Sequence, residues 1–233
     1  SGSVYADGTL NLDSTLTIGA AADGTTIKAT FSAPRGQLDL ESNITNYGTF
    51  THNNGLVRAT HNCEVNNYSS SDKGRSTRFN NFNMNSFTTS FRGNRIWTYT
   101  TAAEAIGTTI LADFDVADAT NLEVGNYILI DSEYMRITAI SGVNLTVERG
   151  VFDSTAATHS DGVNVSYKPV DRIEGTLTVD SGTTVYINPD DSGAPGFLEF
   201  GTDTAQGTLA NSGTVKFDAG ASGLWTGLGG INS

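Results

Sequence analysis

Two acidic residues stand two positions apart in the second half of the chain, at Asp131 and Glu133. A carboxylate pair of this kind can hold a metal ion, or supply the acid and base of glycoside hydrolysis. The same pair can instead end a strand and cap its turn, since Asp131-Ser132-Glu133 joins two apolar runs with good turn chemistry. We favour the structural interpretation and keep the chemical one as the alternative.

The other polar clusters carry weaker signals. Residues 190–193 can supply oxygen atoms to Ca²⁺, but they lack the spaced acidic residues of a dedicated calcium loop, so we expect a solvated turn. His52, His61 and His159 do not have the spacing of a helical metal motif. A Gly-rich phosphate loop, a G-x-S-x-G elbow and a Cys/His dyad are also absent from the sequence. We therefore expect no catalytic residues, no bound metal and no cofactor, and we expect that the protein is not an enzyme.

Basic, aromatic and amide side chains are interleaved between residues 75 and 97. If exposed, they would make a surface for a glycan or a protein partner, because rings stack on the apolar faces of sugars while amides hydrogen-bond hydroxyl groups. The alternative, which we favour, packs the phenylalanines inside the fold and places the asparagines at turns. The residues predicted for such a surface are Arg78, Phe82, Asn83, Phe87, Arg92 and Trp97.

A loose repeat at the two ends of the chain predicts the strands that position these residues. Each copy has a Gly, then Thr or Gln, then apolar residues at alternating positions, and the copies begin at Gly8, Gly36, Gly175 and, more weakly, Gly207. The first two copies lie 28 residues apart and the last two 32, within the ~20–50 residue range of solenoid repeats. Stacked copies bury the apolar face that one copy alone cannot. We therefore predict an all-β fold built as a parallel β-solenoid, with an antiparallel β-sandwich as the alternative.

A denser pattern with its own turns interrupts the repeat in the middle of the chain. Its predicted strands are residues 127–130, 134–140, 145–149 and 163–167. We therefore predict solenoid over residues 1–106, an inserted compact β module over 107–168, and solenoid again over 169–233. Helical periodicity is almost absent, and only residues 101–105 and 116–121 are candidates for a helical turn.

The insertion also carries a recognisable set of motifs. They are the run Val124 to Thr138, the pair Arg149-Gly150, and Ala156-Ala157 followed shortly by His159. In these motifs the insertion resembles a small β module that recurs in structural proteins of tailed bacteriophages. The resemblance covers about a quarter of the chain.

The match departs from that family at Asn126, where Asp is frequent, and over residues 151–155, where a Gly-Thr pair is commoner. The flanking strands resemble the repeats of tail fibres, tailspikes and secreted adhesins, with less specific motifs. These resemblances imply a location at the virion surface, in the tail or on the capsid exterior, and a homotrimeric state. They transfer no catalytic residue.

Composition excludes several classes of partner. The net charge is −12, and residues 1–57, 58–95 and 96–233 carry −3, +4 and −13 of it. Such an acidic chain lacks the basic residues that neutralise nucleic-acid phosphates, and it has no apolar segment for membrane insertion. The single cysteine, Cys63, excludes an internal disulfide and is expected to be a small buried side chain. Because the first residue is Ser1, we expect a piece of a longer chain.

Together these features predict a non-enzymatic structural component of a bacteriophage virion. A tail fibre, tailspike or other surface appendage would fit, with other virion proteins and a host surface glycan as partners. The enzymatic alternative is a tailspike that cleaves host polysaccharide with carboxylates from distant coils. A capsid decoration protein and a secreted bacterial adhesin are the remaining alternatives.

Overall fold

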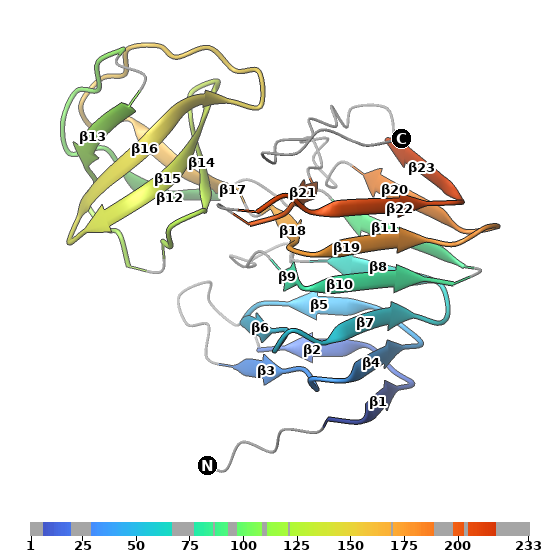
Figure 1. Ribbon diagram of the computed structural model, residues 1–233. Coiled ribbons are helices and arrows are strands. Elements are labelled where there is room, and N and C mark those ends of the chain that lie inside the picture. Colours follow the sequence, from blue (N-terminus) through green and yellow to red (C-terminus); the bar gives the residue numbers. More distant parts are fainter. Residues whose placement is uncertain are drawn as a thin grey trace. The chain divides into compact units, whose positions relative to one another are not determined.

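The fold is described by a computed structural model that covers residues 7–19, 29–66, 77–85, 87–92, 97–108, 111–120, 122–168, 170–188, 198–202 and 205–217. These residues form strands, bridges and turns, and none of them lies in a helix. The chain divides into two compact units, shown in Figure 1. Unit 1 comprises Ser1–Arg95 and Val170–Ser233, and unit 2 comprises Ile96–Pro169.

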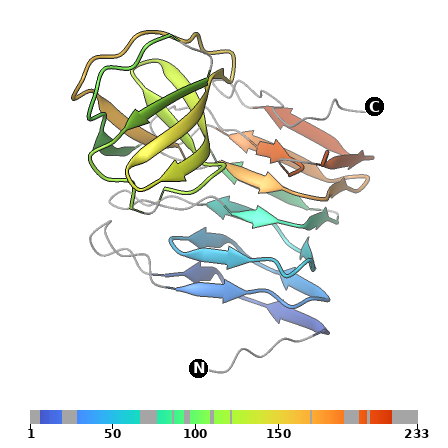
Figure 2. The same cartoon turned by 60° about the vertical axis from the view of Figure 1, so that its left-hand side comes forward.

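Two six-stranded parallel sheets make up most of unit 1, and we call them the first and second ladders. The first ladder has the order β1 (Thr9–Leu12), β4 (Gln37–Leu40), β7 (Leu56–Ala59), β10 (Asn81–Met84), β19 (Thr176–Val179) and β22 (Thr208–Asn211). The second has the order β2 (Leu16–Ile18), β5 (Ile44–Asn46), β8 (Cys63–Asn66), β11 (Thr88–Arg92), β20 (Thr184–Asn188) and β23 (Thr214–Phe217). Figure 2 shows these strands stacked from the blue N-terminal end to the red C-terminal end.

Five shorter strands complete unit 1. Two of them form one parallel pair, and three form a parallel sheet: β3 (Thr30–Ser32) with β6 (Thr49–Thr51), and β21 (Leu198–Phe200), β18 (Asp171–Ile173) and β9 (Arg78–Phe79). Every strand pairing among the described residues of unit 1 is therefore parallel, which differs from the antiparallel pairing of the sandwich alternative.

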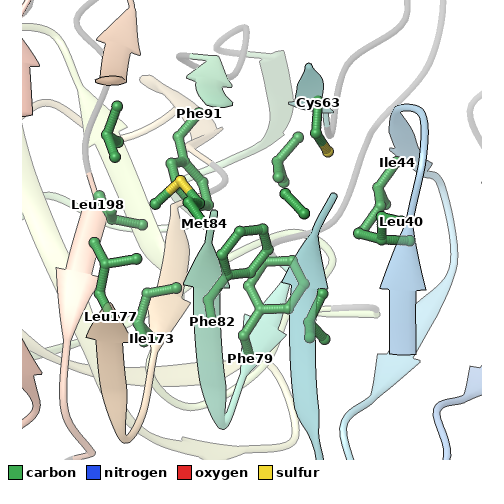
Figure 3. Packing of buried hydrophobic residues seen from close by; sticks show 14 of the residues in the cluster. Leu40, Ile44, Cys63, Phe79, Phe82, Met84, Phe91, Ile173, Leu177 and Leu198 are labelled. Carbon is green, nitrogen blue, oxygen red and sulfur yellow. The ribbon is translucent and has the colours of Figure 1, made fainter. Parts of the chain in front are cut away.

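The core of unit 1 is built from the inward-facing side chains of the ladders. Because successive strand residues point to opposite faces, one side chain in two from each strand enters the same interior. In the first ladder Leu38, Val57 and Phe82 occupy equivalent positions in β4, β7 and β10, and all are buried. Figure 3 shows Phe82 beside Phe79, with Phe91 above them. Of the four phenylalanines of the 75–97 stretch that were predicted inside the fold, Phe79, Phe82 and Phe91 are buried, and Phe87 is 37% exposed.

One outward position of the first ladder is also buried. Alternation along β4 places Asp39 on the outward face, where it lies in register with Arg58 on the next strand. The Arg58 guanidinium donates to both carboxylate oxygens of Asp39, with Nε 3.0 Å from Oδ1 and Nη2 2.7 Å from Oδ2. Gln37 donates to the same Oδ1 at 2.8 Å. Because β4 and β7 stack in register, Asp39 at an outward position is covered and forms an ion pair with Arg58.

Unit 2 is a six-stranded antiparallel sheet. Its order is β12 (Trp97–Thr101), β17 (Asn164–Lys168), β14 (Tyr127–Ile130), β15 (Glu133–Ser141), β16 (Asn144–Val151) and β13 (Leu111–Asp115). An isolated bridge between Ala102 and Val116 links the residues that follow β12 and β13. The two edges of the sheet are thereby brought together around a buried apolar cluster.

Two sequence predictions differ from this arrangement. Unit 2 begins at Ile96 rather than at residue 107, because β12 pairs with β17 and so belongs to the antiparallel sheet. The helical turns expected at 101–105 and 116–121 are not formed by the described residues there. Ala102 and Val116 pair with each other instead, because cross-strand hydrogen bonds satisfy their backbone in extended conformation.

Candidate functional site

The polar residues singled out in unit 2 meet in a group that we call the Glu133 cluster: Asp131, Glu133, Arg149 and His159. Glu133, Arg149 and His159 are buried, and Asp131 is exposed. Glu133 begins β15 and Arg149 lies in the neighbouring strand β16. His159 comes from the segment after β16, where its backbone pairs with Ile106. Asp131 lies in the turn between β14 and β15 with a φ of 53°.

The Glu133 carboxylate accepts five hydrogen bonds within this cluster. Arg149 donates from Nε to Oε1 at 2.6 Å and from Nη2 to Oε2 at 2.5 Å. The backbone N–H groups of Gly150 and Ala157 donate at 3.1 and 3.0 Å. His159 Nε2 lies 2.8 Å from Oε2. Both oxygens of the Glu133 carboxylate are therefore fully used as hydrogen-bond acceptors by groups of the protein itself.

These contacts determine the ionisation of Glu133. Burial by itself raises the pKa of a carboxyl group, because it disfavours the charged form. The hydrogen bonds from Arg149, the Ala157 N–H and His159, together with the Arg149 charge, outweigh burial and lower the pKa of Glu133 to about 2. Glu133 is consequently a carboxylate at neutral pH and cannot serve as a general acid there.

Arg149 and His159, the two side-chain partners of Glu133, make further contacts. Arg149 also donates to the backbone oxygens of Gly107 and Ala157. The second ring nitrogen of His159, Nδ1, lies 2.8 Å from Oδ2 of Asp131. His159 thus bridges the carboxylates of Asp131 and Glu133 through its two ring nitrogens.

The chemistry open to this cluster is limited by access. The side chains of Glu133, Arg149 and His159 are at most 1% exposed, and only Asp131, at 61%, faces solvent. A substrate therefore cannot reach both carboxylates, which argues against a carboxylate pair for glycoside hydrolysis. The cluster instead fastens the segment after β16, and the carbonyl of Gly107, to strands β15 and β16. Glu133 thus has a structural role, but not the turn-capping role expected for it, because its carboxylate is bound by Arg149, His159 and the backbone N–H groups of Gly150 and Ala157.

The surface predicted over residues 78–97 is not brought together in one place. Phe82 is fully buried against Phe79, at a ring-centroid distance of 4.9 Å, so it contributes to no surface. Asn83 and Arg92 point outward from different ladders, and Arg78 lies in the three-stranded sheet. Alternation along each strand is the physical reason, because neighbours in sequence point to opposite faces.

Two residues of that stretch do reach the exterior of unit 1. Phe87 is 37% exposed, and its ring stacks on that of His61 at 5.1 Å. Arg92 Nε lies 2.8 Å from Oε1 of Glu64, across the second ladder. Trp97 belongs to β12 in unit 2, and its side chain lies outside the described residues.

The outward face of the second ladder carries a polar surface that the sequence analysis did not single out. Glu64, Ser90, Tyr186 and Lys216 occupy equivalent outward positions on β8, β11, β20 and β23. Lys216 Nζ lies 5.4 Å from the centre of the Tyr186 ring, a cation–π distance. The alternation of Tyr186 between Val185 and Ile187 is the sequence signal for its outward position, but its neighbours come from distant segments.

The remaining candidates have structural roles or lie outside the described residues. His52 accepts from the backbone N–H of Asn54 at Nδ1, and its Nε2 lies 3.1 Å from Oε2 of Glu174. This hydrogen bond lowers the pKa of Glu174. Burial raises the pKa of the Cys63 thiol to about 12. The acidic turn predicted at 190–193 lies outside the described residues.

Searches for metal and membrane sites give negative findings for the described part of the chain. Among those residues, no group of three or more His, Cys, Asp or Glu side chains is placed to hold a metal ion. The same residues include no helix of the length and hydropathy required to cross a membrane. Comparison of the chain with protein-family models, curated proteins and solved structures finds no match in any of the three.

Proposed function

We propose that the chain is a non-enzymatic structural component of a bacteriophage virion, located at the surface of the tail or of the capsid. The observation that carries this proposal is the Glu133 cluster. The motif residues on which the phage-module resemblance rests, Glu133, Arg149-Gly150, Ala157 and His159, converge on one buried set of hydrogen bonds. Their shared role is to fasten a loop to a sheet, which suits a structural module.

The proposal includes a finer architecture for unit 1, a β-solenoid whose coils each supply one strand to each ladder. The strand orders support it, since β1, β4 and β7 in the first ladder alternate along the chain with β2, β5 and β8 in the second. The shorter parallel strands would form the third side of the coils. A stiff rod of this kind resists bending, because every backbone group in its faces is paired with the coils on either side.

Host contact is assigned in this proposal to the outward face of the second ladder. Its aromatic, hydroxyl and charged groups offer both stacking and hydrogen bonds to a sugar chain, with Tyr186 as the ring and Arg92 and Glu64 as polar neighbours. The other partners are virion proteins, and the proposed assembly state is a homotrimer. No nucleic acid or membrane is part of the proposal.

The assembly state is tested by light scattering together with an SDS gel of unheated protein. A mass of three chains at low protein concentration and an SDS-resistant band are expected for a trimeric appendage. A monomer by both methods would contradict the trimer and move the proposal toward a decoration role.

Host contact is tested by binding of the labelled protein to a panel of bacterial cells, with release of reducing sugar ends measured in parallel. Binding without sugar release is expected, and Tyr186→Ala should weaken it. Thr178→Ala, on the outward face of the first ladder, is the matched control and should bind as the native protein does. Release of reducing ends would contradict the non-enzymatic assignment, and absence of binding to every strain would contradict host contact.

A further inference from the structure

Glycines precede most strands of the first ladder, and they do so for a steric reason. A Cβ atom at Gly36, Gly55 or Gly175 would lie within 3.0 Å of a backbone carbonyl oxygen from the preceding strand pass. No real Cβ atom tolerates such a contact with a backbone, so only glycine allows successive passes to approach this closely. Glycine is therefore required at these positions because another segment of backbone lies against them.

Gly8 is the exception in this series. It precedes β1 as Gly36 precedes β4, and it starts the same Gly-Thr-Leu or Gly-Gln-Leu pattern. Yet no described atom lies within 4 Å of a Cβ built on Gly8. The position has the residue required for close backbone approach, and the described residues contain no backbone that approaches it.

The side chains next to Gly8 show the same incompleteness. Leu10 is 38% exposed, whereas Leu38, its equivalent on β4, is completely buried. Leu12 and Leu16 are only partly buried, although they face the same interior as the buried core residues. The outer edge of β1 is paired with no other strand of the described residues. An apolar surface that continues a core along such an edge is a template for a further strand.

The opposite end of the ladders offers a strand that fits this edge. Gly207-Thr208-Leu209 repeats Gly8-Thr9-Leu10 and begins β22, the last described strand of the first ladder. Leu209 and Val215 are partly buried, as expected for core positions at an edge. Because all the ladder strands are parallel, β22 of one copy and β1 of another run in the same direction when the copies stack end to end.

We propose that a second copy of this chain docks its β22–β23 edge on the β1–β2 edge, head to tail, and so continues both ladders. The register follows from the pairings inside the chain. There the backbone N–H of the residue after a glycine donates to the carbonyl oxygen of the glycine that precedes the neighbouring, earlier strand of the ladder. Gln37 donates to Gly8 at 3.1 Å and Thr208 donates to Gly175 at 2.8 Å. By the same rule Thr9 donates to the partner's Gly207, and Leu209 of the partner packs on Leu10.

This contact joins different surfaces of the two copies, so it does not close on itself and builds linear chains of copies. It is separate from any trimer, which would need an interface that closes after three subunits. Its failure would leave the proposed virion role untouched, and failure of that role would leave the edge pairing untouched.

The first test compares Gly8→Leu with Gly107→Leu in sedimentation velocity across a range of protein concentrations. A Cβ atom at either glycine meets no described atom within 4 Å, so both variants should fold. The native protein and Gly107→Leu should form concentration-dependent linear oligomers, and Gly8→Leu should associate at least tenfold more weakly. Native protein of fixed mass at all concentrations, or equal association of both variants, would overturn the proposal.

The second test measures the register directly. Thr9 and Thr208 are exposed and would be neighbours across the contact. The double variant Thr9→Cys/Thr208→Cys should form a ladder of disulfide-linked oligomers on a non-reducing gel, since neighbouring parallel strands bring Cα atoms within disulfide range. Each single variant should give no species beyond a dimer. Absence of the ladder in the double variant would overturn the register.

Discussion

Glu133 and Arg149 form a two-point ion pair between neighbouring strands of unit 2, with Nε 2.6 Å from Oε1 and Nη2 2.5 Å from Oε2. Both side chains are almost completely buried. A buried pair of this kind holds its neighbours in place through directional hydrogen bonds rather than through net Coulomb energy. The backbone groups of Gly150 and Ala157 complete it, so the loop between them is defined by the same carboxylate.

Removing one partner of this pair should destabilise unit 2 strongly. Glu133→Gln leaves the Arg149 charge buried without its counter-ion, and the free energy of unfolding of unit 2 should fall by about 3–5 kcal/mol. Urea denaturation followed through the amide signals of unit 2 measures the change. Glu148→Gln is the matched control, since Glu148 is exposed on the neighbouring strand β16, next to Arg149, and it should change stability by less than about 0.5 kcal/mol. Equal losses for the two variants would contradict the role of the cluster.

The stability of unit 2 should depend on pH in acid. The pKa of Glu133 is lowered from 4.5 to about 2 in the folded chain, so the folded state binds fewer protons than the unfolded state in that window. The contribution of Glu133 is therefore complete above pH 4.5 and is lost as the pH falls toward 2. The difference in unfolding free energy between native protein and Glu133→Gln should be constant above this window and shrink within it. A difference that stays constant down to pH 2 would show that the carboxylate titrates normally.

Phe82 and Phe87 should respond differently to truncation, although both belong to the surface that was kept as the less favoured interpretation of residues 75–97. Phe82→Ala removes a fully buried ring and should cost unit 1 about 3–5 kcal/mol. Phe87→Ala removes a partly exposed ring stacked on His61 and should cost about 1 kcal/mol. Chemical denaturation of both variants measures the costs. Similar values for the two would place Phe82 outside the core.

Cys63 should be unreactive in the folded protein. Burial raises the pKa of its thiol to about 12, so almost no thiolate exists near neutral pH, and the sulfur is also covered. A thiol reagent such as DTNB should label the native protein only very slowly and label one thiol per chain in denaturant. Ser90→Cys, on the outward face of the neighbouring strand, should add a thiol that reacts readily. Rapid labelling of Cys63 without denaturant would contradict its burial.

The site could be anticipated from the sequence only in part. Asp131 and Glu133 stood out because they are two carboxylates close together, and the module resemblance included Arg149 and His159 without giving them contacts. Strand pattern places Arg149 on the predicted strand 145–149 and leaves Glu133 in the turn before the strand 134–140. It does not specify which residues lie opposite each other, since register depends on the turn between the strands. His159 reaches Glu133 from a segment without regular alternation, and no local signal could place it.

For residues 78–97 the sequence is misleading in another way, because residues that are close in sequence are separated in the fold. Composition there suggested one patch, but Phe82 turned inward while Asn83 turned outward, because alternation separates neighbours. The burial of Asp39 could not be predicted either. Its partner Arg58 comes from the next strand of the ladder, and the sequence of one strand does not specify which later strand will pair with it.

The sequence by itself determined the local conformations and the inward faces. The Gly-led alternating runs predicted strands, and Leu38, Leu40 and Leu177 are buried as that period requires. Tertiary structure alone decided which strands became neighbours, and so which polar groups met. Alternation is a property of one strand, whereas pairing order and register depend on the free energy of all strands packed together. For that reason the ladder that places Glu64 beside Arg92, and the cluster around Glu133, emerge only in the folded chain.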